Sequence, residues 1–208
     1  MPLLKLLRLP GVFTAIADVL AGYLIVRFAG AGEGNPRQLP LLVAASACLY
    51  MAGMAWNDIF DAEEDRRVRP ERPIPAEMIS LTASFFVAVT LSAAALMLAM
   101  TAGMPSFLAA GALLCLILLY DGGLKRVEIL GPLAMGGCRG LNLLLGMTAH
   151  PFALVLAGSP TLQVPVILLA VYTATVTVLA TMETPAPDAP ADLPCESQLE
   201  TALEAVSA

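Results

Sequence analysis

Six long apolar runs constrain this 208-residue chain more than any other feature. Short polar or Pro/Gly-containing breaks separate the runs, which fall at about 11–29, 39–56, 77–101, 105–120, 130–149 and 162–181. A helix of about 20 mostly apolar residues is long enough to cross the roughly 30 Å hydrocarbon layer of a bilayer. The runs therefore predict an all-α fold, a polytopic transmembrane helical bundle of about six spans.

The composition agrees with a protein that lives in a membrane. The chain is 58% hydrophobic and 13% charged, whereas soluble domains average about a quarter charged residues. Its net charge of −6 disfavours nucleic acid as a partner. Much of that charge comes from the acidic, Pro-rich segment 184–208, which we expect to be disordered or to lie on the surface, outside a membrane domain that spans 1–183.

The basic residues predict how the bundle is oriented. Arg27 and Arg37 are expected on one side of the membrane. Eight bases belong to the N-terminus and to the loops at 57–76 and 121–129 on the other side: Lys5, Arg8, Arg66, Arg67, Arg69, Arg72, Lys125 and Arg126. Because cytoplasmic loops of membrane proteins carry an excess of Lys and Arg, we expect the N-terminus and both charged loops to face the cytoplasm, in the cytoplasmic (inner) membrane.

The segment WNDIFDAEEDRRVRPERPIP, residues 56–75, concentrates acids, bases and prolines at the end of the second apolar run. Asn57, Asp61 and Asp65 recur every four residues, so a helix that continues from the run would stack them on one face. Asp58 is next to that row and Glu64 flanks it. Such a set of oxygen ligands suits Mg²⁺, which usually binds one or two carboxylates, waters and substrate phosphate oxygens. The acids therefore predict a metal–diphosphate site.

A plainer interpretation is a solvated loop whose acids pair with the arginines that follow them. Three observations weigh against it: the four-residue spacing, the position at the end of an apolar span, and the RPERP sequence, in which prolines fix Arg69 and Arg72 after the acids.

The same segment resembles the first aspartate-rich signature of the UbiA superfamily of intramembrane prenyltransferases. That pattern runs NDxxDxxxD followed by RPxRP, and residues 57–73 meet every position of it. The resemblance implies that Asp58, Asp61 and Asp65 are catalytic, and that they bind Mg²⁺ together with Asn57. It also implies that Asn57, Arg69 and Arg72 contact the diphosphate.

Two further segments resemble parts of this superfamily. YDGGLKRVEILGP, residues 120–132, is similar to a loop in which Tyr and Lys approach the diphosphate, which implies contacts from Tyr120 and Lys125 and a weaker candidate in Arg126. Anchoring of a cytoplasmic loop by its positive charge is the alternative for these bases.

GGCRGLNLLLG, residues 136–146, is similar to a segment of the EboC-like branch, in which Arg139 and Asn142 could line the substrate pocket. Asp18, in the segment DVLAGY, matches a polar residue common in that branch. A charge inside a span needs a partner or a wet cavity. The alternative for Arg139 is that it snorkels to the membrane interface or pairs with an acid for structure, and the alternative for Asp18 is a hydrogen bond between helices.

What the resemblance implies is Mg²⁺-dependent transfer of a polyprenyl group from its diphosphate to an acceptor, aromatic or lipid, inside a nine-helix bundle in the bilayer. The resemblance ends near residue 183, so we expect a partial, C-terminally truncated version of that fold. Glu183 is a better candidate for the superfamily's second acidic motif than Asp188 and Asp192, because prolines around those two oppose a helix. The alternative is a non-catalytic membrane protein that binds prenyl diphosphate or supports a partner.

Overall fold

A computed structural model of the chain describes residues 6–7, 11–30, 34–150 and 160–183, and these residues contain helices and no strands. Their elements are α2 (Val12–Phe28), α3 (Leu39–Phe60), α4 (Ala62–Val68), α5 (Leu81–Ala102), α6 (Met104–Gly122), the 3₁₀ helix η2 (Leu124–Arg126), α7 (Leu130–Met147) and α9 (Pro160–Glu183). Each apolar run of the sequence forms one long helix. The predicted all-α helical bundle is confirmed.

Four helices within the described residues are long and apolar enough to cross a membrane. They are Leu39–Phe60, Leu81–Ala102, Met104–Gly122 and Leu162–Met182. Of the other two long helices, α2 is shorter, with 17 residues, and α7 carries Arg139 and Asn142 among several glycines. Length and composition alone therefore identify fewer spans than the six predicted.

Local sequence signals explain where the helices begin and end. The Ser80 side chain accepts a hydrogen bond from the Ala83 amide at 3.1 Å and caps the start of α5. Gly103 separates α5 from α6 with a φ of 145°, a conformation that favours glycine. Pro70, Pro73 and Pro75 keep the segment between α4 and α5 out of a helix, so it folds as a series of turns.

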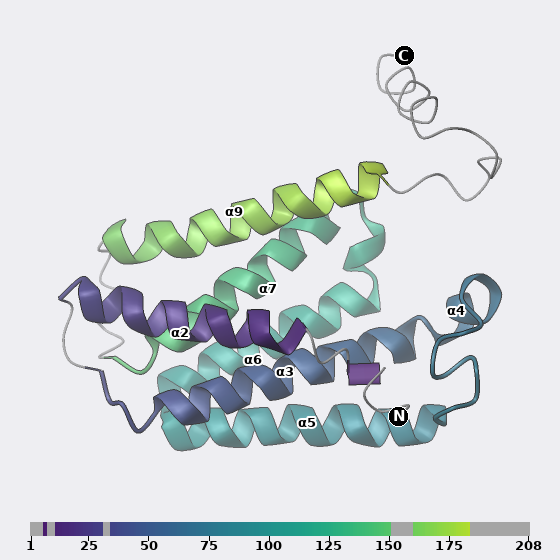
Figure 1. Ribbon diagram of the computed structural model, residues 1–208, viewed down its shortest axis with the longest axis horizontal. Coiled ribbons are helices and arrows are strands. Elements are labelled where there is room, and N and C mark those ends of the chain that lie inside the picture. Colours follow the sequence, from purple (N-terminus) through teal and green to yellow (C-terminus); the bar gives the residue numbers. More distant parts are fainter. Residues whose placement is uncertain (1–5, 8–10, 31–33, 151–159, 184–208) are drawn as a thin grey trace, which may run out of the picture.

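Small residues bring the helices close together. Helix α7 packs on α2, α6 and α9, and α3 packs on α2, α5 and α6; Figure 1 shows α9 and α5 at opposite edges of the bundle. A Cβ atom at Gly22 or Gly146 would overlap the backbone of the facing helix, because α2 and α7 almost touch there. Such contacts are typical of helix packing in membranes.

Both charged loops lie at the same end of the bundle. Leu6 is buried in a small cluster with Ala55 of α3, Ala62 of α4 and Ile74. Figure 1 shows α4 at the same end of the bundle as the connection between α6 and α7. At the opposite end, the Asn35 amide donates a hydrogen bond to the Ala149 carbonyl at 2.9 Å. The acidic segment, the turns after α4 and η2 thus share one end, which holds the candidate site.

Candidate functional site

A polar cavity of about 530 Å³ opens at this end of the bundle. It is lined by Asp61, Glu64, Asp65, Arg69, Tyr120, Lys125 and Arg126. Six of these residues belong to the site predicted from the sequence, and the seventh, Glu64, was expected to flank it. Acids from the α3–α4 segment therefore meet bases and a tyrosine from the α6–η2 segment around one space.

The acidic row follows a helical path with an interruption at Asp61. The Asp61 amide donates to the Asn57 carbonyl at 3.0 Å, and the Asp65 amide donates to the Asp61 carbonyl at 2.8 Å. Both are helix-like bonds, yet α3 ends at Phe60 and α4 begins at Ala62. Asp61 and Asp65 both line the cavity, but each pairs with a different cation.

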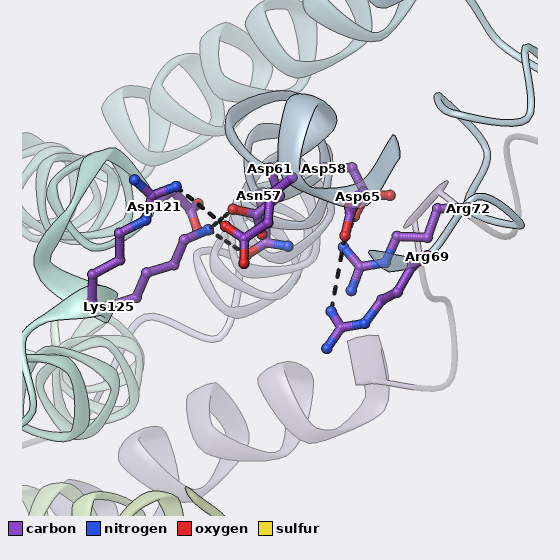
Figure 2. A network of polar contacts seen from close by, with 10 residues as sticks. Asn57, Asp58, Asp61, Asp65, Arg69, Arg72, Asp121 and Lys125 are labelled. Atoms are coloured by element: carbon purple, nitrogen blue, oxygen red, sulfur yellow. Dashed lines mark hydrogen bonds and ion pairs between the residues drawn. The ribbon is translucent and has the colours of Figure 1, made fainter. Parts of the chain in front are cut away.

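Lys125 binds the first part of the acidic row. Its Nζ atom lies 2.6 Å from Asp61 Oδ1 and donates a hydrogen bond to Asn57 Oδ1 at 3.2 Å. Asp121 Oδ1 is 3.8 Å from the same nitrogen, so Lys125 points into a group of three oxygens (Figure 2). The glycines at 122 and 123 end α6 and let the short helix η2 place Lys125 there.

Arg72 binds the second part of the row. Its guanidinium lies 2.6 Å from Asp65 Oδ2 and 3.4 Å from Asp58 Oδ1, as Figure 2 shows for Asp65. Both carboxylates are 3% exposed, and the arginine is a cation that compensates both of them. Arg69 is 3.9 Å from Asp65 Oδ1 and stays more exposed. Asp58 and Arg72 hold the turns against α3, and neither lines the cavity.

The donor atoms suit a hard divalent cation. Asp61 pairs with Lys125 and Asp65 with Arg72, and no three His, Cys, Asp or Glu side chains of the described residues are close enough together to hold a metal. Mg²⁺ does not need such a cage, because it keeps several waters and uses one or two carboxylates plus phosphate oxygens. The Asp61 and Asp65 carboxylates in the cavity meet that requirement.

The three pocket candidates from the spans form a separate network away from this cavity. Arg139 lies 2.9 Å from Asp18 Oδ2, and the Asn142 side-chain amide donates to Asp18 Oδ2 at 3.2 Å and to the Ala15 carbonyl at 2.8 Å. Ser46 Oγ donates to Asn142 Oδ1 at 2.7 Å. The network joins α2, α3 and α7, and none of its members lines the polar cavity.

Sequence reasoning missed two features of the site. Asp121 was not selected, although it follows Tyr120 and precedes Lys125 by four residues. The pairing of Glu64 with Arg126, whose guanidinium lies 3.4 Å from Glu64 Oε2, was missed as well. The spacing from Asp121 to Lys125 is a signal that could have revealed the first.

Comparison with known proteins decides the family. The sequence model of the UbiA prenyltransferase family matches residues 18–193, most of the chain. The chain belongs to the UbiA prenyltransferase family. Together with the apolar helices, membership in this family makes it an integral membrane protein. The predicted superfamily is thus confirmed, whereas its EboC-like branch stays a prediction.

A related protein and two solved structures show how far this UbiA likeness extends. Digeranylgeranylglyceryl phosphate synthase of Metallosphaera sedula is 31% identical over 145 residues, which cover 70% of this chain and 50% of that protein. The chain spans about half the length of the curated relatives it matches. The fold resembles a UbiA homologue from Archaeoglobus fulgidus with a TM-score of 0.70 and 14% identity, over 100% of this chain and 74% of the other. A structure of a UbiA homologue from Archaeoglobus fulgidus bound to DMAPP and Mg²⁺ gives a TM-score of 0.68 at 16% identity. The match covers 100% of this chain and 73% of the other.

Proposed function

We propose that this UbiA-family chain binds a prenyl diphosphate together with Mg²⁺ in the polar cavity, and that it transfers the prenyl group to an acceptor within the membrane. The observation that carries the proposal is the convergence of acids, bases and Tyr120 around one cavity at the end of apolar helices. An amphipathic substrate with an anionic head and an apolar tail fits that arrangement. A homologue of the same fold was solved with DMAPP and Mg²⁺, which supports the choice of ligand.

Each wall of the cavity would hold a different part of the head group. Asp61 and Asp65, with Asn57 beside them, would hold Mg²⁺, which when bound stabilises negative charge on the diphosphate. Lys125, Arg126 and Arg69 would donate charge-assisted hydrogen bonds to phosphate oxygens. The Tyr120 hydroxyl would add a neutral donor. Asp58 and Arg72 would keep the acidic segment folded against the bundle.

The transfer itself breaks the bond between the first prenyl carbon and the bridging oxygen of the diphosphate. The diphosphate leaves with the electron pair of that bond. The carbon then bonds to the acceptor, and the proton that the acceptor loses is taken up by the released diphosphate. The bases of the cavity stabilise the charge that develops on this leaving group. The apolar bundle keeps water from the allylic cation.

Binding without turnover is the second candidate function. The described residues supply one acidic cluster, and the side chains of Glu183, Asp188 and Asp192 lie outside the part of the chain whose side chains are described. A chain that holds a diphosphate through that single cluster would attract the ligand but ionise it slowly. Electrostatic contacts to the transition state are typically worth a factor of about 10² to 10³ in rate each.

The orientation of the cavity is part of the same proposal. The described bases at the cavity end outnumber those at the other end, where Arg27 and Arg37 lie. We infer that the cavity opens to the cytoplasm, where a water-soluble diphosphate head would enter.

The proposal is tested by binding of radiolabelled geranyl diphosphate to the purified chain in lipid nanodiscs. We expect binding with Mg²⁺, little binding with EDTA, and at least about tenfold weaker binding in Asp61→Asn, since one charge-assisted contact contributes about 1.5–3 kcal/mol. Glu63→Gln is the matched control, because Glu63 lies on the adjacent turn but outside the cavity. Binding that survives both EDTA and Asp61→Asn would show that the acids are structural. A transfer assay on the same sample, with phenols and lipid alcohols as acceptors, separates the enzyme from the binder.

A further inference from the structure

Asp121 is a buried carboxylate that the proposed function leaves without a role. It is the last residue but one of α6 and is 5% exposed. It does not line the polar cavity, so it is not placed to bind a ligand there. A buried carboxylate at the end of a membrane span is costly without a cation nearby. Its ion pair with Lys125, at 3.8 Å, supplies that cation.

Lys125 divides its ammonium group between partners with different roles. Asp61 at 2.6 Å and Asn57 at 3.2 Å belong to the proposed metal-binding row, whereas Asp121 comes from the opposite segment. Figure 2 shows Lys125 between the acidic row and Asp121. An ammonium and Mg²⁺ compete for the same carboxylate oxygens because both are cations. Loading of the site must therefore weaken the bond between Lys125 and Asp61.

The long stem of Lys125 lets its ammonium group change direction once that bond is weakened. η2 has three residues and follows Gly122 and Gly123, and a lysine ammonium sits on a flexible four-carbon stem. Asp121, on the last turn of a long helix, is the rigid carboxylate that remains beside the ammonium. Lys125 could otherwise turn away to solvent.

We propose that Asp121 is a positioning residue, which holds the Lys125 ammonium at the cavity wall while Asp61 and Asn57 are engaged by the metal and the diphosphate. This inference rests on the proposed function, and it assigns a role to a residue outside the set that lines the cavity. Asp121 itself touches no substrate; it acts through Lys125.

Two roles of Asp121 predict opposite changes in the affinity for a diphosphate when Asp121 is neutralised. A carboxylate this close to the cavity repels a diphosphate, so neutralising it should strengthen anion binding if charge alone mattered. If Asp121 instead positions Lys125, Asp121→Asn should weaken the binding of a metal–diphosphate complex. The sign of the change distinguishes the two roles.

The experiment measures binding of inorganic pyrophosphate with Mg²⁺ to the full chain in nanodiscs, by calorimetry. We expect about fivefold to tenfold weaker binding in Asp121→Asn, with most of the affinity restored in Asp121→Glu, which keeps the charge. In a Lys125→Met background, Asp121→Asn should no longer weaken binding, because its target is gone and only the repulsion between Asp121 and the anion is removed. Glu63→Gln is the control for loss of an acid at the same end.

Several outcomes would overturn the inference. Unchanged or tighter binding in Asp121→Asn would do so. A double variant that binds pyrophosphate more weakly than Lys125→Met alone would do so as well. If Asp121→Asn does not yield folded protein, Asp121→Glu provides the test. With Lys125 present, Asp121→Glu should change the affinity for pyrophosphate with Mg²⁺ at least about twofold. In the Lys125→Met background it should leave that affinity unchanged. Equal effects in both backgrounds would refute a role through Lys125.

The same titrations separate this inference from the proposed function. Absence of Mg²⁺-dependent pyrophosphate binding by the wild type would overturn the proposed function as well. Normal wild-type binding together with an unaltered Asp121→Asn variant overturns the role of Asp121 alone.

Discussion

The Lys125 ammonium lies 2.6 Å from Asp61 Oδ1 and joins the two sequence segments that build the cavity. Both side chains are mostly buried, with 13% and 16% of their surface exposed. This buried ion pair therefore occupies an oxygen of the proposed metal-binding row. A metal that binds Asp61 has to displace this lysine, and the displaced lysine becomes available to a phosphate.

This relationship predicts opposite effects of Lys125→Met on two ligands. Without the competing ammonium, Asp61 should bind a divalent cation alone more tightly, by about tenfold if one charge-assisted contact is removed from competition. Pyrophosphate with Mg²⁺ should bind more weakly, because a phosphate contact is lost. Calorimetric titrations with Mg²⁺ or Mn²⁺ alone, and then with pyrophosphate, measure both. Weaker binding of both ligands would contradict the exchange of partners and point to a collapsed site.

Arg72→Met should destabilise the protein strongly. Arg72 is the cation next to the buried carboxylates Asp58 and Asp65, and its removal leaves them without this partner. Breaking such a buried pair typically costs about 3–5 kcal/mol of unfolding free energy. Arg66→Met is the matched control, since Arg66 pairs with Glu63 while 60% of its side chain is exposed, and exposed pairs contribute about 0–1 kcal/mol. Denaturation in mixed micelles compares the two, and equal losses would argue against the role assigned to Arg72.

The sequence predicted the helices well because apolar run length and Pro/Gly breaks are local signals. The four-residue spacing of Asn57, Asp61 and Asp65 predicted a helical path, which the structure has with an interruption at Asp61: Asn57 lies in α3 and Asp65 in α4. The partner of each acid could not be predicted in the same way. Lys125 and Arg72 approach the row through the tertiary packing of η2 and of the turns after α4, and a single Asp121 at the end of an apolar run gives no periodic pattern.

Arg139 shows a second limit of sequence reasoning. An arginine inside an apolar run indicates a partner or a wet cavity, and both remained open. The structure supplies the partner in Asp18, from a helix far away in the sequence. No local pattern could have chosen between these alternatives, because the choice depends on how α2 and α7 pack.

Gly146→Ala should destabilise the bundle by separating α2 from α7. An added Cβ would overlap the backbone oxygen of Val19 on the facing helix, which cannot move aside as a side chain could. Overpacking of this kind typically costs about 1–3 kcal/mol. Gly111→Ala is the control, since a Cβ at Gly111 in α6 meets no atom within 4 Å. Alanine is also the better helix former. Thermal melting of the two variants should therefore show a lowered midpoint for Gly146→Ala and an unchanged or raised one for Gly111→Ala; the reverse order would refute this packing of α2 on α7.

The pair formed by Asp18 and Arg139 gives the last prediction, which also decides whether these residues act in structure or in substrate binding. Their atoms lie 2.9 Å apart, with 7% of the aspartate and 27% of the arginine side chain exposed. Asp18→Asn or Arg139→Met alone leaves a charge inside the bundle without its partner. Each should lower the free energy of unfolding by about 3 kcal/mol, which is the lower end of the range for buried pairs because the guanidinium is partly exposed. The double variant removes both charges and should recover most of that loss, to within about 1 kcal/mol of the wild type. If the network is structural, the folded double variant should bind geranyl diphosphate with Mg²⁺ as the wild type does, since neither residue lines the polar cavity. A double variant that is as stable as the wild type but binds geranyl diphosphate about tenfold more weakly, a loss of roughly 1.4 kcal/mol, would instead assign the pair to the substrate pocket.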